Sequence, residues 1–465
     1  MARSWLIIPL FLLYLYHLGG VGFIAPDEPR YAWVSREMAH PGSFSGLVTP
    51  YLYGKPWFEK PPLLYWMTAL ATRLGLRDEW AARVPVALAS IAFLILFYRT
   101  LARELSGSIA VYATTILATS AGWLAYSFEA VTDLPMAVSL GTAILLALTG
   151  EKSQKRGAGA GVFLGLAVLA KALVPLVLFA PIWLMARGRR IGIVIGAAIV
   201  AVPWYATETA LYGNDFLREL IWKQHFARFL NPSLQHVKPF WYYVPVILLG
   251  LFPWTLTPVL LFSRRIWTDP RAQFVGAWCL YTLLFFSIAQ NKLPGYVLPV
   301  MPALAVLLAL ALENANGREI WLAASVLLLA ALPPIVRALP EALLEGARHA
   351  KFTPGLGWPF IALAVLVFFL RKPNVAMILA GLCAAAGVLY VKQSSFPVLD
   401  QRVSARQFFR EHASQIPDAC FDPGVVRRAW QYGLNYYADR ALPECSSQSS
   451  KPRVTVRDGQ LNMQQ

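Results

Sequence analysis

The sequence predicts an all-α protein that crosses a membrane many times, and three observations support this fold class. Of the 465 residues, 57% are hydrophobic and only 14% are charged, whereas soluble proteins carry about 25% charged residues. The mean hydropathy is +0.51. Apolar stretches of about 20 residues, the length that crosses a bilayer as a helix, recur along most of the chain. An integral membrane protein is the class that satisfies all three observations.

The first apolar stretch, from Ser4 to Gly22, is predicted to be an uncleaved span. A cleavable signal would need small residues after it, and Phe23 and Ile24 stand there instead. Further spans are expected to start near Ala81, Ser108, Val131, Ala158, Val174, Ile191, Phe240, Phe274, Tyr296, Ile320, Trp358 and Val375. Residues 1–391 would then form one transmembrane domain with about thirteen spans, an odd number that places the two termini on opposite sides. Its long periplasmic loops, 25–80 and 206–238, are expected to carry amphipathic helices.

Basic residues set the predicted orientation, because short cytoplasmic loops collect Lys and Arg. With Arg3 in the cytoplasm, alternate loops carry Arg99 and Arg103, EKSQKR, ARGRR, SRRIWTDPR, Arg318 and RKP. The N-terminus is therefore expected in the cytoplasm and the C-terminus in the periplasm of a bacterial cell with an inner membrane. This topology and attraction to anionic membrane lipid account for the net charge of +16, so no nucleic-acid partner is expected.

Residues 392–465 are predicted to form a small periplasmic α/β domain. Aromatic and turn-rich pieces such as ARQFFREHASQIPDACFDPG and VRRAWQYGLNYYADR distinguish this tail from the apolar spans. Cys420 and Cys445 lie in the tail, on the side expected to be oxidising, and either a disulfide or two free thiols fits their spacing. Cys279 and Cys383 lie inside spans, where a thiol is ordinary apolar filling.

Charged residues gather at the outer end of the first span. Asp27, Glu28 and Arg30 occur in APDEPRYAWVSREM, which predicts a surface helix because its proline suits a first helical turn. The segment KPWFEKPPLLYW adds Glu59 and Lys60 among aromatic residues that suit the headgroup level. A reaction on a lipid phosphate needs such groups. Singly, however, Asp27 also fits a helix cap, Arg30 a membrane anchor and Lys60 a positive flank.

Motifs for several other functions are absent from the sequence. It contains no Walker loop, dinucleotide fingerprint, HExxH or CxxC. A transporter or flippase for lipid-linked sugars is the alternative function. It predicts functional charges near mid-membrane or on both sides, and repeat symmetry between the halves. The candidate residues lie on one face and the halves do not repeat, so the pattern favours an enzyme.

Four motifs together resemble a known family. They are PDEPRYAWVSREM, GKPWFEKPPLLYW, HFARFLNPSLQHVKPFWYYVPVILLGLFPW and NKLPGYVLPVMPALAVLLA, spread between Met1 and Leu312. They are similar to the aminoarabinose transferases of lipid A and to related protein O-mannosyltransferase-like glycosyltransferases of the GT-C fold. The resemblance implies a periplasmic-face enzyme that transfers a sugar from a polyprenyl-phosphate donor to lipid A or another envelope acceptor. We expect it to act as a monomer.

The resemblance also implies roles for individual residues. Asp27 matches the catalytic carboxylate, and Arg30 and Lys60 match residues that hold the donor phosphate. Lys171 in LAKALVP resembles a basic residue that is usually followed by Gly-Pro, but Ala172 and Leu173 follow it here. Its expected role is also to bind the donor phosphate.

Further site candidates come from the later outside loops. Lys292 and Tyr296 of NKLPGY are expected to meet a phosphate or sugar, although Lys292 also fits a membrane anchor. Asp133 of SFEAVTDLPM is a second outside acid, and a helix N-cap is its structural alternative. Glu28 and Arg228 complete these candidates.

Some relatives imply a divalent metal, zinc or magnesium, beside the donor phosphate. Glu59 of FEKPP matches the carboxylate ligand in that resemblance. The expected imidazole ligand is His236 of QHVKPFW or His225 of QHFARF, with His236 ranked first.

Overall fold

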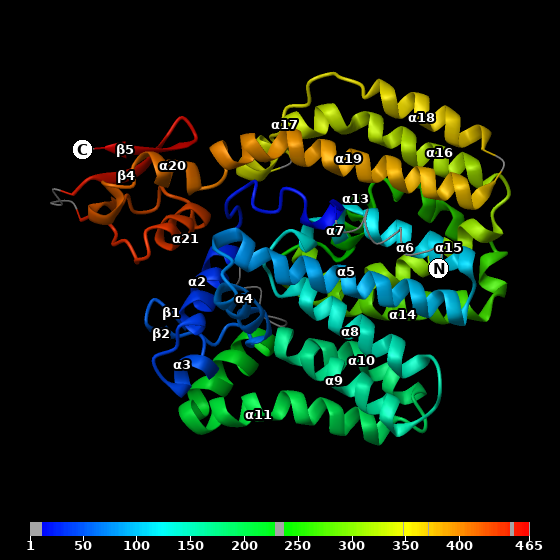
Figure 1. The fold of residues 1–465 in the computed structure, drawn as a ribbon, viewed down its shortest axis with the longest axis horizontal. Coiled ribbons are helices and arrows are strands. Elements are labelled where there is room, and N and C mark those ends of the chain that lie inside the picture. The colour runs from blue at the N-terminus through cyan, green and yellow to red at the C-terminus, as the bar shows by residue number, and fades with distance from the viewer. Residues whose placement is uncertain (1–11, 228–236, 347, 371, 447–450, 465) are drawn as a thin grey trace.

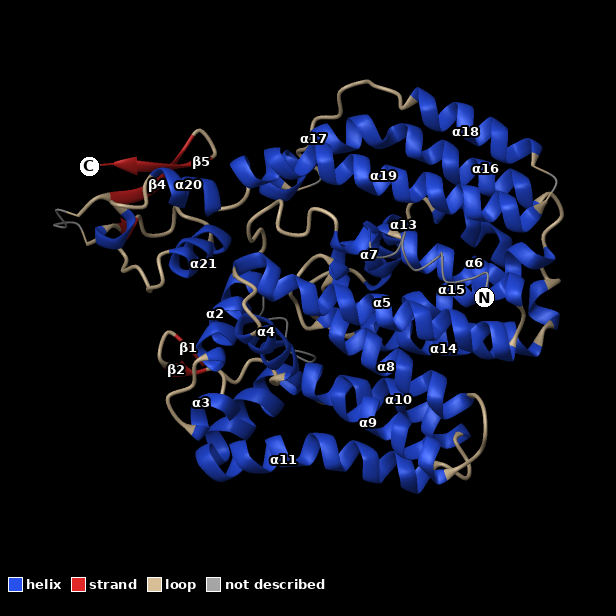
Figure 2. Cartoon of the chain, viewed as in Figure 1, coloured by secondary structure: helices blue, strands red, loops and turns tan. Residues whose placement is uncertain are grey.

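Helices make up most of the structure, and among the described residues the strands gather at one end (Figure 1, Figure 2). The structure is a computed structural model, and it describes residues 12–227, 237–346, 348–370, 372–446 and 451–464. The predicted span from Ser4 to Gly22 therefore lies partly outside the described residues.

The end of the molecule that carries the candidate site is built from short elements. They are α2 (Asp27–Ala39), α3 (Phe44–Val48), β1 (Tyr51–Leu52), β2 (Lys55–Pro56) and α4 (Leu63–Arg73). Strands β1 and β2 pair antiparallel, with Leu52 opposite Lys55. Tyr53 and Gly54 between them both have positive φ, as a tight hairpin turn requires. The helix predicted from Asp27 onward is confirmed.

The helical body follows. Its helices are α5 (Asp78–Glu104), α6 (Gly107–Thr119), α7 (Ala121–Ser127), α8 (Asp133–Leu148), α9 (Gln154–Lys171), α10 (Val174–Met185), α11 (Arg190–Leu217), α13 (Tyr243–Gly250), α14 (Pro270–Ile288), α15 (Val300–Asn314), α16 (Arg318–Leu328), α17 (Leu332–Glu345), α18 (Trp358–Phe369) and α19 (Pro373–Arg402). A π-helical segment, η2 (Arg218–Ala227), continues α11. The body therefore consists of apolar helices, most of which follow one another with short connections.

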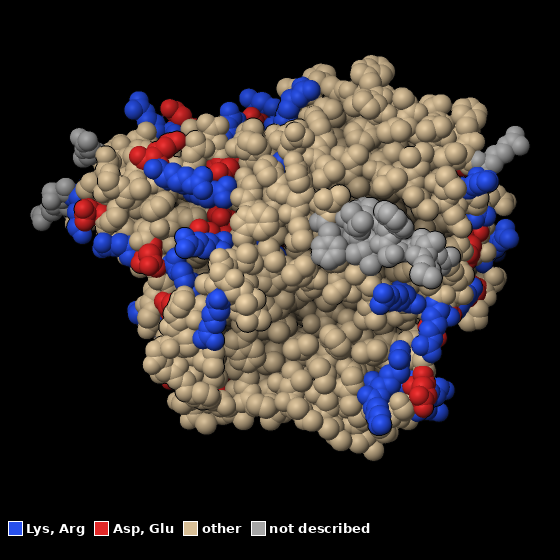
Figure 3. Space-filling model, viewed as in Figure 1, with Lys and Arg blue, Asp and Glu red and all other residues tan. Residues whose placement is uncertain are grey.

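Several of these helices are long and apolar enough to cross a bilayer. Among the described residues there are five such helices, or six if the bent pair α6 and α7 is one span. Shorter apolar helices, such as α8 and α15, occur at other predicted span positions. Figure 3 shows charged side chains toward opposite ends of one face and a broad uncharged band between them. These features are those of a multi-pass membrane protein, while the total of about thirteen spans stays a prediction.

Two helices run past boundaries that the sequence suggests. Helix α11 extends to Leu217, beyond the loop expected to begin at Ala206, and Gly213 bends it with a φ of 55°. Helix α19 ends at Arg402, so it continues through the predicted domain boundary between residues 391 and 392. Apolar composition ends before these helices do, because polar helical turns can continue beyond an apolar stretch.

The C-terminal segment has a small core of its own. It contains α20 (Arg406–Glu411), β3 (Cys420–Phe421), α21 (Arg428–Tyr437), β4 (Arg453–Arg457) and β5 (Gln460–Gln464). Strand β4 pairs parallel with β3 and antiparallel with β5. Phe421, Trp430, Leu434 and Val454 fill the core beneath them. The segment thus combines helices and strands, while a separate periplasmic domain at residues 392–465 stays a prediction.

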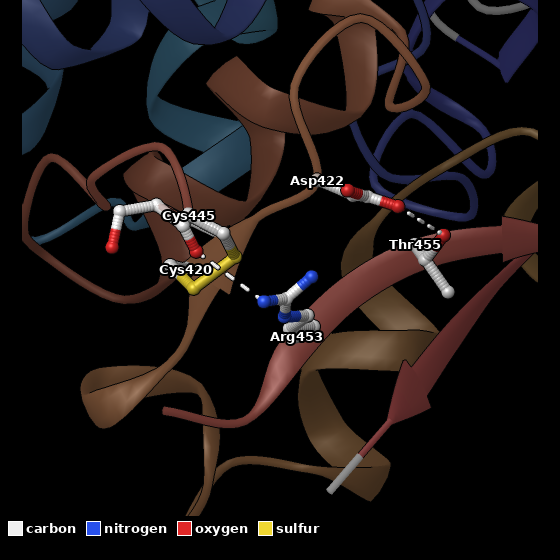
Figure 4. The surroundings of a disulfide bond; sticks show 6 residues. Cys420, Asp422, Cys445, Arg453 and Thr455 are labelled. Atoms are coloured by element: carbon white, nitrogen blue, oxygen red, sulfur yellow. Dashed lines mark hydrogen bonds between the residues drawn. A yellow bond between two sulfur atoms is a disulfide. The ribbon is translucent and has the colours of Figure 1, made fainter. Parts of the chain in front are cut away.

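Cys420 and Cys445 form a disulfide in this segment, which answers the question that their spacing left open (Figure 4). Nearby, the Thr455 hydroxyl of β4 donates to Asp422 Oδ2 at 3.0 Å (Figure 4). The disulfide encloses the whole of α21 in one covalent loop. Cys279 and Cys383 are buried free thiols in α14 and α19, as predicted.

Candidate functional site

The first turn of α2 carries a carboxylate and a guanidinium group of the candidate site. Pro26 is the N-cap, so Asp27 lies inside the first turn rather than at the cap, and its carboxylate pairs with Arg30. Arg30 Nη1 lies 3.4 Å from Glu59 Oε2, and its Nε donates to the Pro26 carbonyl at 3.1 Å. Burial opposes the charge of Arg30, but Asp27 and Glu59 outweigh burial and raise the pKa of Arg30.

Glu59 and Lys60 extend this arrangement between β2 and α4. Lys60 Nζ lies 3.5 Å from Glu59 Oε1, while the other oxygen of Glu59 faces Arg30. The side chains of Lys60 and Glu59 are 16% and 18% exposed, so both are partly withdrawn from solvent. Asp27, Arg30, Glu59 and Lys60 therefore form one continuous row of alternating charges, called the first-loop cluster below.

A second group comes from elements that are distant in the sequence. Lys171, in the last turn of α9, places Nζ 2.5 Å from Oδ1 of Asp133, the first residue of α8. The same Nζ lies 4.4 Å from the ring centroid of Tyr296. Asp133, Lys171 and Tyr296 are called the second-loop cluster. A Cβ at Gly295 would come within 2.7 Å of Asp133 Oδ1, so only glycine leaves room for this carboxylate.

One cavity of about 420 Å³ joins the two clusters. Glu59 and Lys60 line it from the first-loop cluster, and Lys171 and Tyr296 line it from the second. The rest of its lining is mostly apolar: Pro61, Leu173, Val174, Val177, Phe226, Phe285, Phe286 and Ala289. The cavity therefore offers two cations beside a hydrocarbon-like surface.

Two predicted site residues have different surroundings. Glu28, 1% exposed, accepts from Arg83 Nε at 2.7 Å and from Arg83 Nη2 at 2.8 Å, and it also accepts from the Ala130 amide. Lys292, 4% exposed, donates to the backbone carbonyls of Lys238 and Ala289. Their charges are directed at protein groups, so the structure does not bring them into the cavity with Lys60 and Lys171.

The predicted metal ligands are only partly brought together. Glu59 and His225 line the same cavity, but both ring nitrogens of His225 face backbone carbonyls, those of Leu220 and Lys171. Among the residues that the structure describes, no group of three or more His, Cys, Asp or Glu side chains could hold a metal ion. These residues do not by themselves fit a zinc or magnesium site. His236 and Arg228 lie outside the described residues, so their roles stay predictions.

Sequence reasoning missed one residue at the site. The Cζ atom of Arg30 lies 4.9 Å from the ring centroid of Tyr432 in α21 and 5.4 Å from that of Trp57. Trp57 stands next to FEKPP and was expected near the membrane surface. Tyr432 lies in the C-terminal segment, beyond all four motifs, and no local pattern connects it with Arg30.

Comparison with known proteins supports the fold and the resemblance. The family described as dolichyl-phosphate-mannose-protein mannosyltransferase matches residues 59–206. The undecaprenyl phosphate-alpha-4-amino-4-deoxy-L-arabinose arabinosyl transferase of Edwardsiella ictaluri is 32% identical over 337 residues, which cover 66% of this chain and 59% of that protein. A second transferase of that name, from Pseudomonas fluorescens, is 30% identical over 387 residues, covering 78% and 65%. The chain thus spans less than two thirds of the length of these relatives.

A solved structure shows the same fold. The crystal structure of ArnT from Cupriavidus metallidurans bound to undecaprenyl phosphate matches 97% of this chain and 87% of its own, with a TM-score of 0.76 and 20% identity. The apo form of that ArnT matches with a TM-score of 0.73. The chain is therefore a multi-pass membrane protein of the GT-C fold, similar to the aminoarabinose transferases of lipid A.

Proposed function

We propose that this protein is a glycosyltransferase that moves a sugar from a polyprenyl-phosphate donor to a lipid or envelope acceptor. The cavity between the two clusters carries this proposal, because Lys60 and Lys171 line it together with apolar side chains. A polyprenyl-phosphate sugar has matching parts, an anionic phosphate and a hydrocarbon chain. Cations stabilise the first part and apolar walls the second.

The chemistry follows from the leaving group. The bond between the sugar C1 and the phosphate oxygen breaks, and its electron pair leaves with the polyprenyl phosphate. Lys60 and Lys171, placed in a partly dry cavity, stabilise the negative charge that develops there. A new bond then joins C1 to an oxygen of the acceptor.

Asp27 is the proposed catalytic carboxylate. Its side chain is 40% exposed, so an acceptor can approach it, and Arg30 links it to Glu59 in the cavity wall. With a hydroxyl acceptor, Asp27 takes the proton that the acceptor loses. With a phosphate acceptor no base is needed, and Asp27 instead stabilises the positive charge that develops on the sugar ring.

The names of the relatives suggest the substrates. The curated relatives are named for undecaprenyl phosphate aminoarabinose, and the solved ArnT is bound to undecaprenyl phosphate. We therefore propose undecaprenyl phosphate as the carrier lipid and transfer of 4-amino-4-deoxy-L-arabinose to lipid A as the most specific version. Zinc or magnesium at Glu59 is a separate proposal: the described residues do not form such a site by themselves, so the ion would need His236, or His225 released from its backbone partners, and metal analysis of the purified protein tests it.

The same proposal includes a location and an organisation. The enzyme works in a bacterial inner membrane, with its N-terminus in the cytoplasm and both clusters on the periplasmic side. About thirteen spans carry the site, and residues 392–465 form a small periplasmic domain around the Cys420–Cys445 disulfide. The disulfide supports a periplasmic position for this domain, because the periplasm is an oxidising compartment. The protein acts as a monomer.

Mass spectrometry of envelope glycolipids tests the function in cells. Lipid A and other glycolipids are compared between cells that lack the protein and the same cells complemented with wild type or Asp27→Asn. The proposal predicts a sugar mass that disappears in the deletion and returns only with wild type.

Two other results would contradict parts of the proposal. A sugar mass that also returns with Asp27→Asn would remove the catalytic role of Asp27 and favour the transporter alternative. Unchanged glycolipids in the deletion would exclude lipid acceptors and direct attention to polysaccharide or protein.

A further inference from the structure

The C-terminal segment lies against the first-loop cluster. In Figure 1, α21 lies near α2, at the end of the molecule that also carries β4 and β5. Arg36 of α2 donates to the Tyr436 carbonyl at 3.1 Å and pairs with Asp439 at 2.8 Å. Asn435 Nδ2 donates to the hydroxyl of Tyr53 at 3.1 Å. Hydrogen bonds and an ion pair therefore hold α21 and the residues just after it against both α2 and the β1–β2 turn.

A second set of contacts fixes the same helix to the start of the helical body. The Tyr437 hydroxyl donates to Glu79 Oε1 at 2.5 Å and accepts from the Phe23 amide at 3.2 Å. Arg406, the first residue of α20 in the same segment, pairs with Glu79 at 3.2 Å and Asp400 at 3.0 Å. These contacts hold the C-terminal segment against the start of α5 and the residues just before α2.

Tyr432 occupies a special position on α21. Trp430 and Leu434 fill the core of the C-terminal segment, and in an α-helix a residue midway between an i, i+4 pair points to the opposite side. Tyr432 is half-buried, and its ring centroid lies 4.9 Å from Cζ of Arg30. Its ring therefore serves the contact with Arg30 instead of the core.

We propose that Tyr432 is a positioning residue for Arg30 and that the C-terminal segment thereby completes the active site. This inference rests on the proposed function and on the role that the family resemblance implies for Arg30, which is to hold the donor phosphate. Arg30 has two carboxylate partners, Asp27 and Glu59, in different directions. The rings of Tyr432 and Trp57 restrict the guanidinium plane, so that the N–H groups not used by these partners keep one orientation for contact with the phosphate.

A purely structural role of Tyr432 is the competing explanation, and Tyr436 supplies a matched control. Tyr436, on the same helix, places its ring centroid 4.4 Å from Cζ of Arg36, which belongs to neither cluster. Tyr436 is also 4% exposed, so its removal should weaken the docking of α21 more than removal of Tyr432 does. A docking effect should therefore be greatest for Tyr436, whereas a positioning effect should be greatest for Tyr432.

The test compares Tyr432→Leu, Tyr432→Phe and Tyr436→Leu in the full-length protein. For each variant we would measure the melting temperature, the kcat and KM for sugar transfer, and the Kd for undecaprenyl phosphate alone. Tyr432→Leu should lose about 3- to 30-fold in kcat/KM and raise the Kd by a similar factor, at an almost unchanged melting temperature. Tyr432→Phe keeps the ring and should restore wild-type values, while Tyr436→Leu should mainly lower the melting temperature.

Every other outcome contradicts either the positioning role of Tyr432 or the proposed function. Wild-type values of kcat/KM and Kd in Tyr432→Leu would overturn the positioning role. So would losses of kcat/KM in Tyr432→Leu and Tyr436→Leu that each follow the fall in melting temperature of the same variant. If wild type transfers no sugar but binds undecaprenyl phosphate, the proposed function fails and the Kd comparison still decides the role of Tyr432. If wild type does not bind undecaprenyl phosphate either, both proposals are wrong.

Discussion

Asp27 and Glu28 are neighbours in the sequence, but the fold gives them opposite surroundings. Glu28 is 1% exposed and holds Arg83 with both of its oxygens, and Arg83 also donates to the carbonyls of Leu18, Val21 and Gly22. Asp27 is 40% exposed and shares Arg30 with Glu59. The pair Glu28–Arg83 thus ties the end of the first span to α2 and α5, while Asp27 faces the open side of the site.

This difference separates two uses of charge in one loop. A buried pair that meets all its hydrogen-bonding needs inside the protein has no capacity left for a ligand. A partly exposed row of alternating charges can exchange protein partners for a substrate. The contrast predicts that changes at Glu28 act on stability and that changes at Asp27 act on turnover.

The largest effect is expected for Asp27→Asn. Loss of the carboxylate should lower kcat by about 10²- to 10⁴-fold, because proton transfer or charge stabilisation in the transition state depends on it. The melting temperature should stay near that of wild type, since Asp27 is exposed. Transfer kinetics in proteoliposomes and a thermal melt check both parts, and near-normal turnover would refute the assignment.

Glu28→Ala should act mainly on stability, whereas Asp27→Asn should act mainly on turnover. Removal of one partner leaves the Arg83 guanidinium buried without its carboxylate, which should cost about 3–5 kcal/mol of stability. Asp27→Ala, the matched control next to it, should change stability by less than about 1 kcal/mol, as for other exposed pairs. Thermal melts of the two variants decide the comparison, and equal destabilisation would show that it is wrong.

The disulfide is expected to stabilise the C-terminal segment. Cys420 and Cys445 are 25 residues apart and enclose α21, and closing a loop of this size contributes about 3 kcal/mol in the chain-entropy description. The double variant Cys420→Ser, Cys445→Ser should therefore expose the loop around α21 to protease. The Cys279→Ser variant, which removes a buried free thiol, is the control for loss of sulfur alone. Identical digestion of the double variant and wild type would contradict the prediction.

Lys60→Ala and Lys171→Ala should weaken donor binding. Each lysine lines the cavity, and loss of a charged hydrogen bond to phosphate should raise KM by about 10- to 100-fold. Lys292→Ala should leave KM unchanged, because Lys292 is held by the carbonyls of Lys238 and Ala289 outside this cavity. An equal rise in KM for all three variants would indicate a general effect of charge and not a binding site.

Substitution of Glu129, in the loop between α7 and α8, should give the smallest of these effects, a pH-dependent change in stability. Burial, together with the nearby charges of Glu28, Asp27 and Asp133, raises the pKa of Glu129 from 4.5 to about 8. Between these two pH values the folded state keeps a proton that the unfolded state loses, so stability falls as the pH rises from 4.5 to 8. Glu129→Gln removes this penalty and should melt a few degrees higher than wild type at pH 8, but not at pH 4.5. The same difference at both pH values would contradict this cause.

Much of the first-loop cluster could be predicted because its residues are close in the sequence and carry local signals. A proline in the first helical turn and acids at the helix start indicate α2, and FEKPP places an acid and a cation beside a rigid turn. The second-loop cluster depends on tertiary packing of α8 against α9, which periodicity alone does not give. The resemblance directed attention to Lys171, and the place of NKLPGY at an outside turn directed it to Tyr296.

Other features lie beyond local patterns for physical reasons. Arg83 looks like an ordinary residue near the start of a span, and only its partners in the fold reveal the buried pair. Tyr432 reaches Arg30 because the C-terminal segment folds back against α2. The helix bounds of α11 and α19 were also missed, because polar residues continue a helix wherever tertiary contacts support it.

Incubation of the purified protein in proteoliposomes with a polyprenyl-phosphate sugar and lipid A tests the central claim most directly. Mass spectrometry would follow both lipids. Our account predicts that each glycosylated acceptor appears with one molecule of free polyprenyl phosphate, and that Asp27→Asn yields neither. A donor that stays intact while it moves from one leaflet to the other would contradict the account and identify a transporter.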